Sequence, residues 1–142
     1  MNNVTTIEKN GKTYAHFFQG NMPINGEVEF VTKDDAPLQV GMFERKEGYE
    51  VDAHTHLARD MHLENVGEFL WIQSGSALVK IYDESWEQLC EHTIRANECA
   101  IFLRGGHAVT MLEPTRILEV KQGPYEDQSQ KKMFRNQEEQ TS

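Results

Sequence analysis

The sequence predicts an all-β domain, a sandwich or barrel, and two observations carry this prediction. Short runs rich in β-branched and aromatic residues recur at fairly regular spacing and are separated by turn residues. Helix is suggested only for residues 58–64 and for the polar tail, 126–142, which is otherwise expected to be loose. Many short antiparallel strands without helices are typical of a sandwich or barrel.

The strands are expected between clear turn signals, such as Gln73-Ser74-Gly75-Ser76 and Arg104-Gly105-Gly106. Residues 1–12 are polar and are expected to be loose. The predicted strands cover Tyr14–Phe18, Glu27–Thr32, Leu38–Glu44, Val51–His56, Gly67–Gln73, Ala77–Tyr82, Gln88–Ile94, Glu98–Leu103, Ala108–Leu112 and Arg116–Lys121.

Length and charge narrow the class of protein. The 142 residues fit one domain over 1–142, with its core at about 38–121. The net charge of −9 argues against nucleic acid as a partner, because binding phosphates requires clustered Lys and Arg. The start of the chain has no apolar stretch like that of a signal peptide, and no apolar run approaches the roughly 18 residues of a membrane span. We therefore expect a cytoplasmic protein without a membrane partner.

The segment from Glu68 to Gln73 places apolar side chains on both faces of a strand. Glu68 shares one face with Leu70 and Ile72, whereas Phe69 and Trp71 lie on the other. A barrel interior would bury the first face. A second sheet or a partner subunit must cover the second face, and we expect a homodimer.

The sequence His54-Thr55-His56 suggests a metal site. Residues i and i+2 of a strand point to the same side, so two imidazoles can reach one ion at about 2.0–2.1 Å per nitrogen. Alone, the pair is equally consistent with a structural role. Glu68 strengthens the metal interpretation, because a carboxylate inside a barrel needs a partner and a cation held by histidines supplies one.

These residues resemble the two motifs of the cupin superfamily, in particular small single-domain cupins with an RmlC-like jelly roll. Residues 48–75 keep both flanks of the first motif, G(X)5HXH and E(X)6G, and residues 97–111 match the second loosely. The resemblance covers about residues 38–121. It implies an all-β double-stranded β-helix, or jelly-roll barrel. It also implies that His54, His56, Glu68 and His107 hold a divalent metal ion.

The chain departs from the first cupin motif between its two flanks. Eleven residues separate His56 from Glu68, where the family has three or four. Residues 57–67 must therefore loop out, as a lid over the pocket mouth or in some other arrangement. Such a loop could also displace Glu68 and bring His62 or Glu64 to the metal instead.

The second motif is incomplete, and other side chains are candidates for the pocket. Phe102 replaces the family's proline, Arg104 a glycine and Met111 the final asparagine. Arg104 could hold a substrate carboxylate or phosphate, or could be a plain turn residue. Glu119 and Lys121 share a face of the last strand and either pair inside the pocket or face solvent.

Three functions remain open from the sequence. Three imidazoles and one carboxylate suit Zn, Fe, Mn, Ni, Co or Cu, and such a centre would act on a small organic or sugar-like substrate by dioxygenation, isomerisation or decarboxylation. A metal-independent isomerase or epimerase on a nucleotide sugar, with histidine as the general base, is the second. A ligand-binding module without turnover is the third. Fold alone does not choose among them.

Overall fold

The protein is built from β-strands. In the computed structural model, which describes residues 3–125 and 132–135, ten strands form three antiparallel sheets. The strands are β1 (Val4–Lys9), β2 (Lys12–Gln19), β3 (Val28–Phe30), β4 (Gly41–Phe43), β5 (Glu68–Ser74), β6 (Ser76–Tyr82), β7 (Gln88–Arg95), β8 (Glu98–Phe102), β9 (Gly106–Met111) and β10 (Arg116–Lys121). The predicted all-β class is confirmed.

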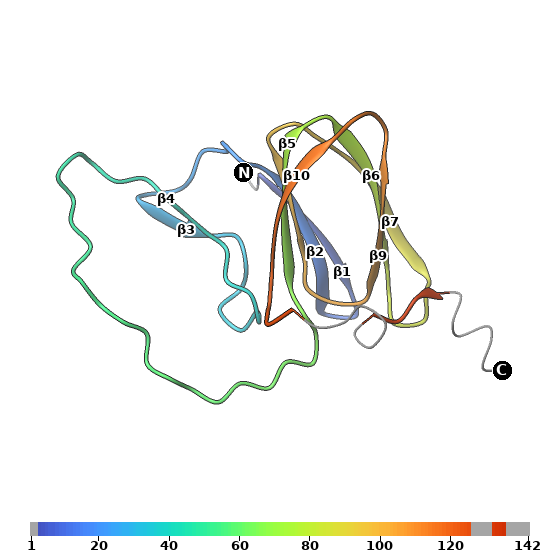
Figure 1. Cartoon of the computed structure of the whole chain (residues 1–142), viewed down its shortest axis with the longest axis horizontal. Coiled ribbons are helices and arrows are strands. Elements are labelled where there is room, and N and C mark those ends of the chain that lie inside the picture. Colours follow the sequence, from blue (N-terminus) through green and yellow to red (C-terminus); the bar gives the residue numbers. More distant parts are fainter. Residues whose placement is uncertain (1–2, 126–131, 136–142) are drawn as a thin grey trace.

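Two of the sheets face each other and enclose the main core (Figure 1). One has the strand order β1-β2-β8-β5-β10 and the other the order β7-β6-β9, and among the described residues no ladder joins them into a closed barrel. The fully buried Ile72 of the larger sheet belongs to the same cluster as Val79, Ile81 and Ile94 of the smaller sheet. Leu70 belongs to this cluster too, so the inward face predicted for Glu68, Leu70 and Ile72 is confirmed.

The outer face of the larger sheet is covered by the chain itself. A second cluster contains Cys99 and Ile101, and Phe69 and Trp71 pack against it. Val31, Leu38 and other apolar residues between β2 and the end of β4 complete this layer. The second apolar face of β5 therefore finds its cover within the same chain.

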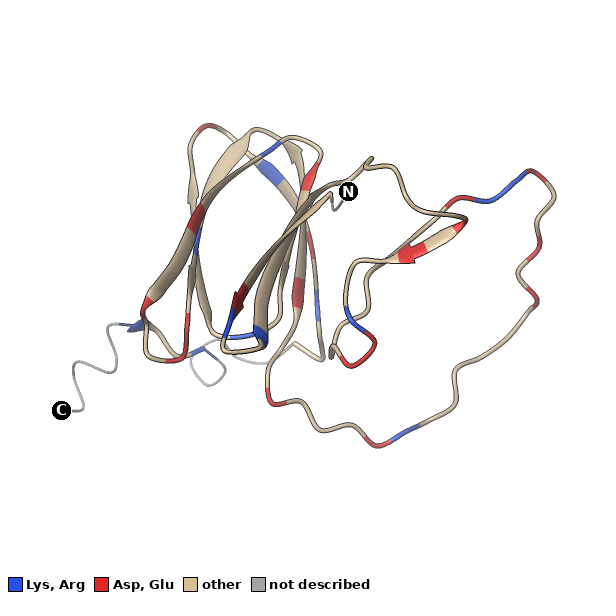
Figure 2. Ribbon diagram, turned by 180° about the vertical axis from the view of Figure 1, so that it is seen from behind, with Lys and Arg blue, Asp and Glu red and all other residues tan. Residues whose placement is uncertain are grey.

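The segment between β4 and β5 differs most from expectation. The predicted strand Val51–His56 and the suggested helix at 58–64 are both absent, and every residue from 43 to 62 is exposed. Figure 1 shows this stretch as a long loop that swings away from the sheets, and Figure 2 shows charges of both signs along it. Phe43 packs edge-on against Phe30, but Val51, Leu57 and Met61 are each more than half exposed. Local strand propensity alone therefore does not form a strand here.

The N-terminus was predicted to be loose, and for residues 4–9 this is wrong. β1 pairs with β2 from Val4 opposite Phe18 to Lys9 opposite Lys12. Ile7 packs against the main core, and Lys9 forms ion pairs at 2.6 Å with Asp83 and at 3.0 Å with Glu87. Val4 packs against the second cluster, so two apolar contacts and one cation are enough to add an edge strand in an otherwise polar stretch.

Most of the C-terminal tail lies outside the described residues. Its two large apolar side chains in the described part, Met133 and Phe134, are both more than half exposed. The Arg135 guanidinium lies 5.4 Å from the centre of the Tyr82 ring, which brings this part of the tail to the end of β6.

Candidate metal centre

Glu68 and His107 meet between the two sheets. Glu68 begins β5, whereas His107 lies near the start of β9 in the opposite sheet. The His107 Nε2 atom is 3.2 Å from Glu68 Oε2, and 32% and 15% of the two side chains are exposed. Two of the four predicted ligands, 39 positions apart in the sequence, therefore lie in contact, and solvent reaches them.

The sequence around His107 fixes the position of its ring. His107 is paired with the buried Ile81 across the β6–β9 ladder, so its side chain points into the space between the sheets. The imidazole stacks on the ring of Phe102, with 4.2 Å between centroids and 19° between planes. Phe102, the residue that departs from the cupin proline, thus forms one wall of the site.

The turn before His107 depends on two glycines. Gly105 has a φ of +69°, and a Cβ atom there would lie 2.2 Å from the Tyr82 carbonyl oxygen. A Cβ on Gly106 would lie 2.4 Å from the Trp86 ring. Only glycine lets the chain pass this close to β6 and its following turn, which sets where β9 and His107 begin.

The surroundings of Glu68 favour its ionised form. The hydrogen bond from His107 lowers the pKa of the Glu68 carboxyl, and this outweighs the opposing effect of burial; the positive charge of Lys121 lowers it further. Lys121 lies opposite Glu68 in the β5–β10 ladder. Glu68 is therefore held as a carboxylate, the form that binds a cation.

The other two predicted ligands lie elsewhere. His54 and His56 are on the exposed segment between β4 and β5, with their ring centroids 5.3 Å apart. The two imidazoles are neighbours, as the i, i+2 spacing predicts, but they do not approach Glu68 or His107. Among residues 3–125 and 132–135, no group of three or more His, Cys, Asp or Glu side chains is arranged to hold a metal ion.

The other residues predicted as ligands or pocket residues lie in three different parts of the structure. His62 and Glu64 are exposed on the same segment as His54. Arg104 forms an ion pair with Glu84, at 3.4 Å, in keeping with a turn residue. Glu119 and Lys121 are exposed, but their register opposite Leu70 and Glu68 places them on the inward side of the edge strand β10.

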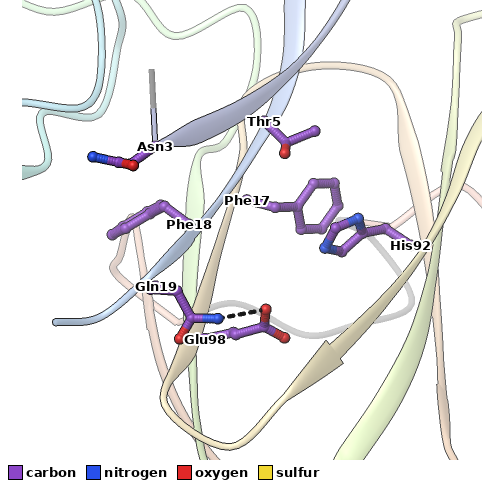
Figure 3. A pocket seen from close by; sticks show the side chains of 7 residues that line it. All are labelled: Asn3, Thr5, Phe17, Phe18, Gln19, His92 and Glu98. Carbon is purple, nitrogen blue, oxygen red and sulfur yellow. Dashed lines mark hydrogen bonds between the residues drawn. The ribbon is translucent and has the colours of Figure 1, made fainter. Parts of the chain in front are cut away.

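A hollow that the sequence does not predict lies beside β2, β7 and β8 (Figure 3). Its volume is about 110 Å³, and it is lined by Asn3, Thr5, Phe17, Phe18, Gln19, His92 and Glu98. His92 stacks on Phe17 at 4.2 Å, and burial lowers the pKa of its imidazole. The sequence could not reveal that Phe17 and His92 stack, because the two residues are far apart in the chain.

Comparisons of the chain with known proteins give no match. No family model matches it, and neither the curated proteins nor the solved structures include a significant match. Within the described part of the chain, no helix has the length and apolar character needed to cross a membrane.

Proposed function

We propose that the protein is a small cupin whose divalent metal ion is held by His54, His56, Glu68 and His107, and that it acts on a small organic or sugar-like substrate. The contact between Glu68 and His107 carries this proposal. A carboxylate and an imidazole predicted as ligands from separate motifs meet on the inward faces of opposed sheets. Their partial exposure leaves room for further ligands and a substrate.

The state of His54 supports its role as a ligand. Its Nδ1 atom lies 2.7 Å from the backbone carbonyl oxygen of Asp52, so Nδ1 donates a hydrogen bond there. This arrangement leaves Nε2 with its lone pair available, as in many histidine ligands of metals. His56 lies beside it and offers a second imidazole.

The histidine pair must move to complete the site, and the chain around it permits this. Residues 44–67 connect β4 to β5 without a strand or helix of their own. An extended chain spans about 3.3 Å per residue, so each arm of this connection is long enough to carry His54 over tens of ångströms. Arg45 ties the start of the segment to Glu27, at 3.0 Å, but every residue from 50 to 62 is exposed.

When bound, a divalent metal would supply a Lewis acid that polarises a substrate carbonyl or hydroxyl. Of this chain's residues, Glu68 would offset the charge of the ion, and Phe102 would keep one side of the site apolar. Lys121, on the inward side of β10, would attract an anionic group of the substrate despite the overall negative charge.

The test is the metal content of protein purified without added metal, together with four variants. Glu68→Gln and His107→Ala should each lose most of the bound metal, and so should His54→Ala/His56→Ala, because removing one ligand weakens a four-ligand site by orders of magnitude. Glu64→Gln is the matched control and should keep it. Full occupancy in the histidine double variant would refute the assignment, and loss in Glu64→Gln but not in Glu68→Gln would transfer the role to Glu64.

One observation favours a second function. A histidine whose ring nitrogen contacts a carboxylate is the arrangement of a general base and its orienting partner, and Glu68 and His107 form it without His54 or His56. In this alternative the protein is a metal-independent isomerase or epimerase of nucleotide sugars. Thermal-shift screening with nucleotide sugars tests for the ligand. Turnover that survives His54→Ala/His56→Ala but not His107→Ala would select this function over the metal centre.

A further inference from the structure

Residues 50–57 form a strand-like segment that pairs with no strand in the described part of the chain. Residues 50–57 read Glu-Val-Asp-Ala-His-Thr-His-Leu, so that acidic residues and histidines alternate with Val51, Ala53, Thr55 and Leu57. Val51 and Leu57 are 70% and 87% exposed. The side-chain hydrogen bond found within this stretch is local, from His54 to Asp52.

Strand β10 lies at one edge of the larger sheet. Among the described residues β10 pairs only with β5, so its other side presents unpaired backbone groups. Leu118 and Val120 on its outer face are 42% and 50% exposed. An open edge beside exposed apolar side chains is a template for another strand.

The segment and the edge are complementary. Leu118 and Val120 lie opposite Trp71 and Phe69 and so point outward, whereas Glu119 and Lys121 point inward. A strand added to β10 with Val51 and Leu57 outward would extend this apolar strip. The same orientation would turn Asp52, His54 and His56 inward, toward the cation of Lys121 and the Glu68–His107 pair.

We propose that residues 50–57 of one copy of the chain add as a strand to β10 of a second copy, and that the exchange is reciprocal. β10 is not the only outer strand, since β1, β7 and β9 also end their sheets among the described residues. It is the outer strand that pairs with β5 beside Glu68, so a twofold exchange would bring each copy's segment to the other copy's site. The segment swings away from its own sheets, the position from which it would reach a neighbour (Figure 1). Each metal site would then combine His54 and His56 of one chain with Glu68 and His107 of the other, an assignment that rests on the proposed metal centre.

Complementation between two inactive variants tests this arrangement. His54→Ala/His56→Ala and Glu68→Gln/His107→Ala should each bind no metal. When they are unfolded together and refolded at a 1:1 ratio, half of the dimers are mixed, and each mixed dimer regains one intact site. The mixture should therefore recover about a quarter of the wild-type metal content. If the wild type binds metal but the mixture binds none, each site is built within one chain: the exchange is then refuted and the metal centre stands.

A second measurement decides the exchange without metal. Asp52→Pro/Ala53→Pro removes the N–H groups of two adjacent residues, one of which must face β10 in any strand pairing. Light scattering during size exclusion should give a dimer for the wild type and a monomer for this variant. Ala58→Pro/Arg59→Pro, just beyond the proposed strand, is the matched control and should remain a dimer. A monomeric wild type, or a dimer that withstands Asp52→Pro/Ala53→Pro, would overturn the proposal even if the metal centre fails.

Discussion

Strand β5 and the segment that leads into it are neighbours in the chain, but β5 is packed on both faces and the segment is exposed. β5 carries large apolar side chains on both faces, Leu70 and Ile72 on one and Phe69 and Trp71 on the other, and each face is packed against a cluster of its own. The preceding segment has the same alternation, but one of its faces is polar and the other is thinly apolar. The contrast teaches that alternation makes a strand only where another surface buries it.

The largest effect should come from truncating the packed region. Ile72 is fully buried in the main core, so Ile72→Ala should lower the free energy of unfolding by about 2–5 kcal/mol. Leu57→Ala in the exposed segment should change it by less than about 0.5 kcal/mol in dilute solution. Urea denaturation measures both. Equal losses would mean that the segment is packed as firmly as β5. A loss for Leu57→Ala that grows with protein concentration would place this side chain in a subunit interface.

Two glycines, one beside the packed sheets and one in the exposed segment, allow the same comparison for the backbone. Gly105 and Gly48 both have positive φ, +69° and +83°, but a Cβ would strike Tyr82 at Gly105 and would meet nothing within 4 Å at Gly48. Gly105→Ala should destabilise the fold by about 2 kcal/mol or more, from the left-handed backbone and the clash together. Gly48→Ala should cost less than about 0.5 kcal/mol, because the detached segment can relax. Thermal denaturation of the two variants checks the difference; similar costs would show that the segment around Gly48 is rigid.

The smallest effect concerns acid stability. The Lys9 hydrogen bond lowers the pKa of Asp83 below its ordinary value of 3.8, with help from the backbone N–H groups of Glu87 and Ser85. The unfolded chain therefore binds this proton more readily, so the contribution of Asp83 is present above pH 4 and is lost as pH falls through the lowered pKa. Asp83→Asn should lower stability at neutral pH and flatten its fall in acid, as measured by urea denaturation from pH 2 to 7.

Asp60→Asn, in the exposed segment, is the control for that measurement and should alter stability by less than about 0.5 kcal/mol. An unchanged acid limb in Asp83→Asn would show that the ion pair with Lys9 makes no contribution in solution.

Much of the fold could be predicted because its strands carry their own burial signals. The strands from β5 to β10 were predicted to within about two residues, since their apolar alternation and the turns between them are local features. β1 was missed because Val4 and Ile7 are sparse, and the ion pairs of Lys9 depend on a turn more than seventy positions away. Val51–His56 was wrongly predicted as a strand of the chain because its sequence does not reveal that a packing surface is missing.

The candidate site divides in the same way. Glu68 and His107 could be predicted because each lies at a fixed place on a well-formed strand. The stacking of His107 on Phe102 could not, since it depends on how the two sheets face each other. The position of His54 and His56 follows from the eleven residues before Glu68, a departure that warned of a loop without revealing its path.

The strand order of the larger sheet has a consequence for biosynthesis. β2 pairs with β8, so Ala15 cannot pair until Phe102 has been synthesised. β5 likewise cannot complete its pairing until β10, which ends at Lys121, has been synthesised. A nascent chain would therefore expose the apolar side chains of β2 and β5 until nearly the whole domain has left the ribosome. Pairings this distant in the sequence slow folding and favour association of unfinished chains, so growth at low temperature or with added chaperones should improve the yield of folded protein.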